Sequence, residues 1–382
     1  MQAQTQRAGS YDLAVVGAGI IGLSCAWRAA RSGMSVVVLE RDEPGAGASG
    51  VAAGMLAPVT EADFGEEELL LTNVKARALW PGFAAELSEA TGLSTGYVDS
   101  GALVVAADRD DAEELRRLHD FQRRLGLASE WLGARAARSL EPGLSPRIGG
   151  AIDAPDEGHV DPAAVLRALV SGLAEAGADV RSGAEVVALD TAGRRVRGVT
   201  VAGGETVRAQ RVLVSDGAWS ARGGPGAQAG VPAVRPVKGQ LLELRTRLGV
   251  PPPARRLIRT PRCYVVSRPA DEGPATVVIG ATMEEQGFDT AVTAGAVHQL
   301  LEAAYEVLPD IGELELVRAR AGLRPFTSDG RPAVGSGSVG GLFFAIGHGR
   351  NGVLQAPLTA NLVLELLGGG APARTLERAG AA

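Results

Sequence analysis

The sequence has very little cysteine, lysine and histidine, and each shortage excludes a class of protein. Its two cysteines, Cys25 and Cys263, lie far apart without metal-ligand spacing, so a disulfide framework is excluded and a cytoplasmic location is expected. Four scattered histidines suggest neither a zinc centre nor a Ser-His-Asp triad, and no metal is expected. Lys75 and Lys238 are the only lysines, so arginine carries nearly all the positive charge.

Long apolar runs are also missing. No stretch approaches the ~20 uninterrupted apolar residues of a membrane span, and the glycine-rich first apolar run does not resemble a signal peptide. The net charge of −6 argues against nucleic acid or an acidic membrane as partner. A chain of 382 residues, 46% hydrophobic and 21% charged, is expected to be a soluble enzyme with two domains.

A β-α-β pattern opens the chain after about ten polar residues. Residues 12–16 form a short apolar run, residues 20–31 have helical spacing, and residues 35–39 are rich in valine. The first run and the helix are joined by the segment Gly17-Ala18-Gly19-Ile20-Ile21-Gly22. This order of strand, glycine turn and helix predicts a dinucleotide-binding site.

Each part of this pattern has a physical task. Gly17 allows the tight turn, Gly19 lets the backbone approach a pyrophosphate, and Gly22 permits close packing of helix on strand. The amide groups at the start of the helix would hold the phosphate charge. Glu40 closes the next strand and is placed to accept hydrogen bonds from ribose hydroxyls.

A second glycine match shows how weak the bare motif is. The segment Gly335-Ser336-Gly337-Ser338-Val339-Gly340 has the same spacing but leads into Leu342-Phe343-Phe344, which reads as a strand and not as a helix. We therefore interpret it as a loop. Because the chain has only one credible copy of the glycine motif, separate FAD and NAD(P)H domains are not expected. The motif alone does not distinguish FAD from NAD, since both bind at this turn.

The rest of the chain alternates helical and β patterns. Helices are expected at residues 66–91, 108–126, 162–176 and 293–308, with Asp161 capping the third. Strands are expected within residues 96–106 and 178–215, a loop at 44–58, a linker at 223–236, and a closing strand, loop and helix over 342–367. The first ten residues and the tail from Gly368 are expected to lack regular structure.

Four further segments resemble the D-amino-acid-oxidase family of flavoproteins, and within it the glycine oxidases of the thiamine pathway (ThiO-type). They are residues 47–58, Arg262-Cys263-Tyr264-Val265-Val266, the stretch 321–332 around Gly-Leu-Arg-Pro, and residues 347–357, which begin Gly-His-Gly-Arg-Asn-Gly. Their order covers nearly the whole chain. The resemblance implies FAD as cofactor.

The resemblance also implies which residues contact FAD. The adenosine and pyrophosphate half would meet the glycine turn with Ile20, Ile21, Glu40 and Arg41, and Val186 would meet the adenine. The flavin half would meet two segments, one contributing Ala48, Ser49, Ala53, Gly54 and Met55 and the other His348, Gly349, Arg350, Asn351, Gly352, Val353 and Leu354. The C-terminal turn holds no cysteine, so we expect non-covalent FAD.

For the substrate, the resemblance implies that Arg324 binds a carboxylate and that Tyr264 and Arg350 assist it. A planar guanidinium can grip a carboxylate with two charge-assisted hydrogen bonds. Arg350 could equally form a structural ion pair. Arg262 stands where one glycine oxidase of the family carries histidine, and Asp216 stands in a motif that usually has small residues. These departures bear on substrate preference and on cofactor affinity.

The expected fold is α/β (α+β), a Rossmann-type FAD-binding domain interleaved with an antiparallel-sheet substrate domain. The FAD domain is assigned to residues 1–90, 156–225 and 322–382, and the substrate domain to 91–155 and 226–321. The expected reaction is oxidative deamination of glycine, with O2 as acceptor and H2O2 as product. Sarcosine and small D-amino acids are further candidate substrates. A homo-oligomer is expected.

Three alternatives stay open from the sequence. The same fold can act as a sarcosine, D-amino-acid or proline dehydrogenase that passes electrons to another acceptor. An NAD-dependent dehydrogenase would use the same glycine turn but would be colourless. A flavin-binding module without turnover would be yellow, and no amine would bleach it.

Overall fold

The β-α-β unit expected at the start of the chain is present. In the computed structural model, which describes residues 9–269 and 273–369, it consists of β1 (Tyr11–Val16), α1 (Ile20–Arg31) and β2 (Val36–Leu39). Leu13 and Val15 face one core while Ala14 and Val16 face another. Burial on both faces is typical of a central parallel strand. The expectations for residues 1–8 and 370–382 lie outside the described residues.

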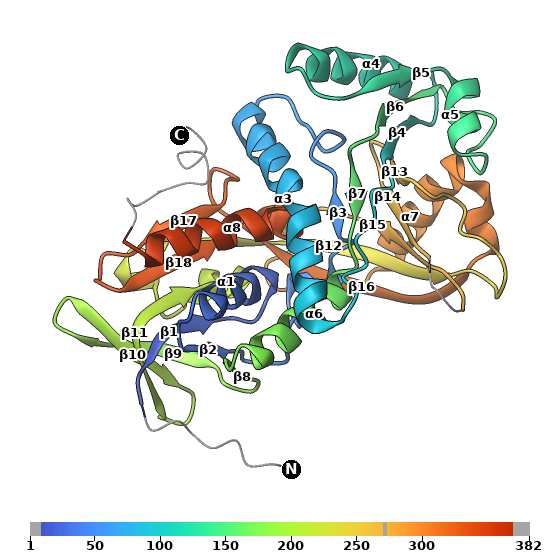
Figure 1. Cartoon of the computed structure of the whole chain (residues 1–382). Coiled ribbons are helices and arrows are strands. Elements are labelled where there is room, and N and C mark those ends of the chain that lie inside the picture. The colour runs from blue at the N-terminus through green and yellow to red at the C-terminus, as the bar shows by residue number, and fades with distance from the viewer. Residues whose placement is uncertain (1–8, 270–272, 370–382) are drawn as a thin grey trace.

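The first large sheet is built around this unit (Figure 1). Its order is β17-β18-β11-β1-β2-β8, with parallel pairing from β18 to β8, antiparallel pairing of β17 with β18, and a further hairpin of β9 and β10 on β11. The added strands are β8 (Asp179–Arg181), β9 (Val186–Ala192), β10 (Arg195–Val201), β11 (Thr206–Val214), β17 (Ala333–Ser336) and β18 (Leu342–Ile346).

Helices cover one face of this sheet. They are α1, α3 (Glu67–Thr91), α6 (Pro162–Glu175) and α8 (Gly352–Leu367), and they bury Trp27, Trp80 and Phe83 as T-shaped aromatic pairs. The sequence predicts α3 and α6 to within one residue, and the Asp161 side chain accepts the Ala163 amide as the expected cap. Pro81 lies inside α3 without ending it.

The second large sheet has the order β16-β12-β15-β14-β13-β4-β6-β5 and is antiparallel except for the β13–β4 pair. Its strands are β4 (Ala102–Ala106), β5 (Glu130–Leu132), β6 (Gly150–Ala154), β12 (Arg235–Arg245), β13 (Leu257–Arg259), β14 (Tyr264–Arg268), β15 (Thr276–Gly280) and β16 (Glu315–Phe326). The helices α4 (Arg109–Arg124), α5 (Ala134–Leu140) and α7 (Ala294–Val307) belong to this half. The predicted fold class is confirmed.

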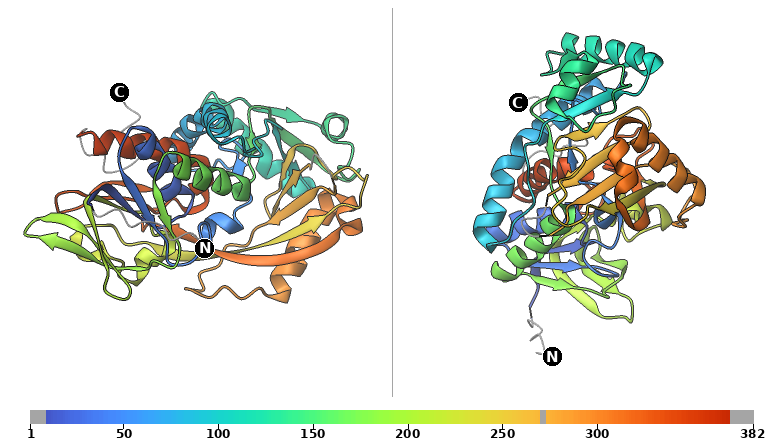
Figure 2. Two further views of the ribbon diagram at one scale, coloured as in Figure 1. Left: turned by 60° about the horizontal axis from the view of Figure 1, so that its bottom comes forward. Right: turned by 90° about the vertical axis from the view of Figure 1, so that its right-hand side faces the viewer.

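The chain passes between the two sheets repeatedly, and the views in Figure 2 show the sheets at opposite ends of the molecule. The joining region holds α2 (Ala48–Val51) and the small pair of β3 (Met55–Leu56) with β7 (Gly158–His159). Residues 44–58, expected as a loop, thus contain one helical turn and one short strand. The expected linker 223–236 ends inside β12, which begins at Arg235.

The second glycine motif begins in β17 and continues into the turn before β18. It opens no helix. Within the described residues there are also four 3₁₀ segments: η1 (Gly217–Arg222), η2 (Ala227–Ala229), η3 (Pro309–Glu313) and η4 (Gly349–Asn351). Two of them, η1 and η4, lie beside the site described next.

Candidate active site

The glycine turn between β1 and α1 needs glycine at two positions. Gly17 has φ of +97°, and a Cβ there would lie 2.6 Å from the Ser215 carbonyl oxygen. A Cβ at Gly22 would lie 2.1 Å from the Gly17 carbonyl oxygen. The first clash would separate β1 from the end of β11, and the second would lift α1 off its strand. Gly17 therefore makes the tight turn, and Gly22 allows α1 to pack closely against its strand.

The start of α1 presents backbone donors. Its helical hydrogen bonds begin with Leu23 N to Gly19 O, so the earlier amides are outside the helical ladder. The Ile20 amide donates to Ser49 Oγ at 2.9 Å, which ties the helix to α2. Glu40 accepts from Ala18 N at 2.7 Å and from Asp42 N at 3.0 Å, and its oxygens keep further acceptor capacity.

One cavity of about 830 Å³ runs along this turn and into the second sheet. It begins between Glu40 and Val186, passes the start of α1, and ends between Tyr264, Arg324 and the turn before α8. The predicted residues that line it are Gly17, Gly19, Ile20, Ile21, Glu40, Arg41, Ala48, Ser49, Ala53, Gly54, Met55, Val186, Tyr264, Arg324, His348, Gly349, Arg350, Gly352 and Val353.

Three of the predicted cofactor residues do not line the cavity. Gly22 packs beneath the glycine turn, Asn351 is buried in η4, and Leu354 is buried in α8, where its carbonyl accepts the Trp80 indole N–H at 2.9 Å. The rest of the set forms a glycine cradle, a helix N-terminus and an acidic residue at the far end. These features fit the dinucleotide that the fingerprint predicts.

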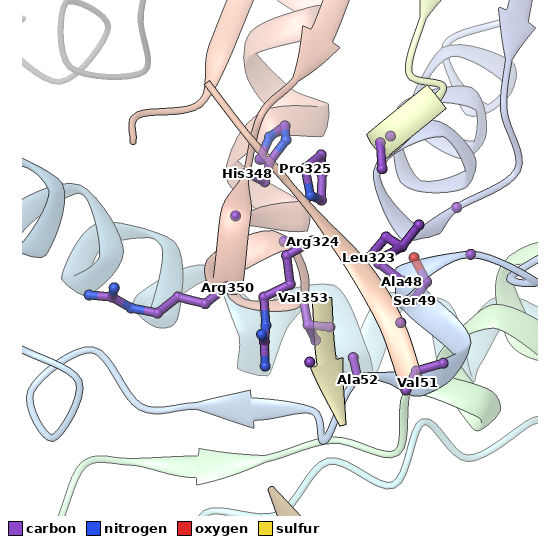
Figure 3. Close-up of a pocket in the computed structure, with 18 of the residues that line it drawn as sticks. Ala48, Ser49, Val51, Ala52, Leu323, Arg324, Pro325, His348, Arg350 and Val353 are labelled. Atoms are coloured by element: carbon purple, nitrogen blue, oxygen red, sulfur yellow. The ribbon is translucent and has the colours of Figure 1, made fainter. Parts of the chain in front are cut away.

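Arg324 lies near the end of β16 and extends over the neighbouring strand (Figure 3). A Cβ at Gly239 on β12 would lie 2.4–2.5 Å from three atoms of its guanidinium, so the glycine provides the space for the side chain. Arg324 Nη1 donates to the Thr282 carbonyl at 3.0 Å. Among the described residues it has no ion-pair partner, which leaves its remaining donors available to an anion in the cavity.

Tyr264 faces the same space from β14. A Cβ at Gly280, its register partner on β15, would lie 2.3 Å from the phenol oxygen. Burial raises the pKa of Tyr264 to about 12, and the nearby Arg324 charge opposes that rise. The hydroxyl therefore stays protonated near neutral pH and can donate a hydrogen bond.

Arg350 extends away from Arg324, toward the start of α3 (Figure 3). Its Nη2 donates to Glu66 Oε2 at 2.7 Å and reaches the Glu61 carbonyl at 3.5 Å. Arg350 lines the cavity, and its guanidinium already has an ion-pair partner. Glu61, Ala62, Asp63 and Phe64, from the same loop, line the cavity as well.

His348 is a buried residue at the turn before α8. Its ring nitrogen Nε2 lies 3.0 Å from Thr359 Oγ1, and burial lowers the pKa of His348 to about 3. The ring is therefore neutral at physiological pH. It anchors the turn to α8, whose first residues Gly352 and Val353 line the cavity.

The two departures from the family pattern have their own partners. Arg262 forms an ion pair with Glu306, and both side chains are about 40% exposed. Asp216 contacts Ser220 Oγ, and burial raises its pKa to about 6. Both Arg262 and Asp216 line the cavity, the first close to Tyr264 in the chain and the second beside the glycine turn.

Sequence reasoning missed Gly239, Gly280 and Thr282, which shape the space around Arg324 and Tyr264. A glycine inside a strand pattern often marks a close approach of another group, so Gly239 and Gly280 carried a signal that could have been used. Thr282 acts through its carbonyl, for which the sequence has no signal.

Within residues 9–269 and 273–369 no helix combines the length and apolar character needed to cross a membrane. The same residues contain no group of three or more His, Cys, Asp or Glu side chains arranged to hold a metal ion.

Comparison with known proteins places this architecture in a family. A family model described as FAD dependent oxidoreductase (DAO) matches residues 12–366. A glycine oxidase from Geobacillus kaustophilus is 36% identical over 369 residues, covering 94% of this chain and 93% of that protein. The bifunctional protein ThiO/ThiG of Trichormus variabilis is 31% identical, covering 93% of this chain and 52% of its own length.

A solved structure agrees with the sequence matches. The crystal structure of glycine oxidase from Bacillus cereus superposes with a TM-score of 0.86 at 31% identity, covering 95% of this chain and 98% of that one. The match spans both sheets, the cavity between them and the glycine turn. The chain therefore belongs to the DAO family of FAD-dependent oxidoreductases.

Proposed function

We propose that the protein is a glycine oxidase, which converts glycine, O2 and water into glyoxylate, ammonia and hydrogen peroxide. The observation that carries this proposal is the Arg324 guanidinium, which has no ion-pair partner among the described residues and lines one cavity with the protonated Tyr264 hydroxyl. The relatives named glycine oxidase support the choice of glycine. The relatives named ThiO support a role in thiamine biosynthesis.

Arg324 would hold the substrate carboxylate with two parallel hydrogen bonds, because its planar fork matches the two carboxylate oxygens. The Tyr264 hydroxyl would donate a third. Gly239 and Gly280 leave room for both side chains, and the Thr282 carbonyl fixes the rotation of the arginine. With its acid end fixed, a small amino acid has few orientations left, which lowers the entropic part of the barrier.

When bound, FAD would supply the electron acceptor for the hydride that leaves the α-carbon. The amine of the substrate must be neutral before this transfer, so the rate is expected to rise with pH until that nitrogen is deprotonated. The residues proposed to hold FAD are those of the glycine turn, Glu40, Arg41, Val186, the segment around α2 and β3, and the turn 348–354. The N-terminus of α8 would stabilise negative charge on the ring.

Arg350 is proposed to assist substrate binding indirectly, by holding a loop that lines the cavity. Its ion pair with Glu66 and its contact with the Glu61 carbonyl hold the loop that forms the outer wall of the cavity. This role differs from direct contact with the carboxylate. Substitution of Arg350 is therefore expected to raise KM more than it lowers kcat.

We further propose that each sheet marks one domain. The FAD domain would comprise residues 1–90, 156–225 and 322–382, and the substrate domain residues 91–155 and 226–321. Strand β16 runs from Glu315 to Phe326 and crosses the last of these boundaries, so Arg324 lies where the domains join. A homo-oligomer and a cytoplasmic location stay predictions.

An anaerobic bleaching experiment tests the function. The flavin absorbance of the purified protein is recorded while glycine, sarcosine and D-alanine are added in turn, and peroxide is measured after air is admitted. Glycine is expected to bleach the flavin fastest and to yield peroxide. A faster response to sarcosine or D-alanine would assign the site to that amine. A yellow protein bleached by no amine would leave only a flavin-binding module.

A further inference from the structure

Trp219 lies at the edge of the cavity, beside its phosphate-binding end. It belongs to η1, which follows Ser215, and the Ser215 backbone contacts the position of Gly17. A Cβ at Gly47 would lie 3.2 Å from the Trp219 ring. Gly47 is two residues before Ser49, whose Oγ accepts the amide of Ile20 at the start of α1. The indole therefore borders the place where backbone amides face the cavity.

Two other side chains, Phe288 and Arg41, contact this indole, and a third, Arg222, stacks on Phe288. The Trp219 and Phe288 ring centroids are 6.4 Å apart at 51°. The Arg41 guanidinium carbon lies 4.5 Å from the Trp219 centroid, and that of Arg222 lies 3.9 Å from the Phe288 centroid. We call Arg41, Trp219, Phe288 and Arg222 the aromatic latch. Three of the four line the cavity, and Phe288 packs behind Trp219.

Phe288 comes from the other sheet, on the loop 281–293 between β15 and α7. Lys238, which is 1% exposed, anchors that loop through Nζ to Asp289 at 2.6 Å and to Glu284 at 3.9 Å. Gln240 adds hydrogen bonds to Glu284 Oε1 at 2.7 Å and from Thr293 N at 2.8 Å. Phe288 is thus held in place next to a residue fixed by a buried lysine.

We propose that the aromatic latch closes over the adenosine-diphosphate half of bound FAD and retains it. The two guanidinium groups would offset the diphosphate charge, and the two rings would shield that charge from water. Because Arg41 and Trp219 follow the first sheet while Phe288 follows the second, the latch joins both sheets across the cofactor. The proposal rests on FAD dependence and not on the identity of the amine.

Binding to apoprotein tests the latch without turnover. FAD is stripped from the wild type and from Trp219→Ala, Phe288→Ala and the double variant, and the Kd values for FAD and for ADP are measured by calorimetry. Loss of one aromatic and one cation–π contact is expected to weaken binding of both ligands about tenfold. The double variant loses the same aromatic pair as each single variant, so its loss of affinity is expected to be smaller than the sum of the two single losses.

Two controls separate the latch from general damage. Trp131→Ala removes another arginine–tryptophan stack, with Arg116 at 4.8 Å, whose tryptophan does not line the cavity, and it should leave both Kd values within twofold. Trp219→Phe keeps an aromatic ring and should restore most of the affinity. If Trp219→Ala fails to fold, Phe288→Ala and Trp219→Phe carry the test.

Three results would overturn the proposal. Unchanged FAD affinity in Trp219→Ala and Phe288→Ala would show that the stack does not retain the cofactor. Weaker FAD binding with unchanged ADP binding would place the effect at the isoalloxazine half. Additive losses in the double variant would mean that the two rings act separately. None of these measurements depends on glycine, so failure of the latch and failure of the proposed reaction are distinguishable.

Discussion

Arg324 owes its availability to its surroundings as much as to its charge. Other arginines near it on β16 have carboxylate partners: Arg318 and Arg320 both reach Glu243. Arg324 instead lies over a glycine and bonds to a carbonyl. A cation held this way in a cavity favours an anionic ligand, because the ligand supplies the missing counter-charge.

Replacing Arg324 by leucine is expected to remove roughly 2–5 kcal/mol of transition-state stabilisation. At ~1.4 kcal/mol per decade, kcat/KM for glycine should fall by two or more orders of magnitude. The flavin spectrum should not change. Arg318→Leu, on the same strand but 54% exposed, is the matched control and should stay within twofold of wild type. An Arg324→Leu variant with half the wild-type activity would refute the carboxylate role.

Glu157 is a buried carboxyl that holds the outer wall of the cavity. It accepts hydrogen bonds from the Val59 amide, the Thr60 amide and the Thr60 hydroxyl. Burial raises the pKa of Glu157 from 4.5 to about 7 despite these bonds. The folded protein therefore binds a proton more tightly than the unfolded chain between these two values.

Stability is expected to fall as pH rises from about 4.5 to 7, because ionised Glu157 is disfavoured in the folded state. The total loss in the free energy of unfolding across this pH window is about 3 kcal/mol at most. Urea midpoints of Glu157→Gln should lack this component across the same pH window. Glu141→Gln, which alters another buried carboxyl that accepts backbone amides, should keep it. Identical pH slopes for wild type and Glu157→Gln would contradict the assignment.

At the level of elements, the turn between β1 and α1 requires both an unusual backbone angle and an absent side chain. Gly17→Ala is expected to lose most FAD affinity, since the new methyl group would displace Ser215. Gly33→Ala is the control: its φ of +93° imposes similar backbone strain, yet nothing lies within 4 Å of its Cβ. That variant should lose about 1–2 kcal/mol of stability and keep its flavin, as measured by absorbance per mole of protein.

Elements with strong local patterns were predicted well. The β-α-β unit and the helices α3, α6 and α7 match their expected bounds closely, because periodicity and capping residues such as Asp161 and Thr293 specify them locally. The parallel pairing of β4 with β13 joins residues more than 150 positions apart, and no local pattern encodes it. The Trp219–Phe288 contact also joins residues far apart in the sequence. Neither this contact nor the β4–β13 pairing could therefore be predicted from the sequence.

At the scale of the whole molecule, the cofactor cavity is lined from both sheets, so FAD binding is expected to stabilise the entire chain. At a hundredfold excess over Kd the gain is about 2.7 kcal/mol, and the holoprotein should melt several degrees above the apoprotein. Equal melting temperatures would mean that FAD does not link the two halves.

Preparing the apoprotein for this comparison requires that FAD can be released intact, which means that it is not covalently bound. Cys263 is the one cysteine that lines the cavity within the described residues, and burial raises its thiol pKa to about 11, which disfavours the nucleophilic thiolate. Acid precipitation should therefore leave a colourless pellet and a yellow supernatant. A pellet that stays yellow would indicate a covalent bond.

Only the six residues 327–332 separate the end of β16 from the start of β17, and Arg324 lies shortly before them in the sequence, near the end of β16. Any rotation of one sheet against the other would move Arg324, and the carboxylate proposed to bind it, relative to the flavin ring. Catalytic alignment is thus tied to the rigidity of one short crossover. Inserted residues should be harmless at Gly193, in the turn between β9 and β10, where nothing lies within 4 Å of an added Cβ, and should abolish activity between Thr327 and Pro332.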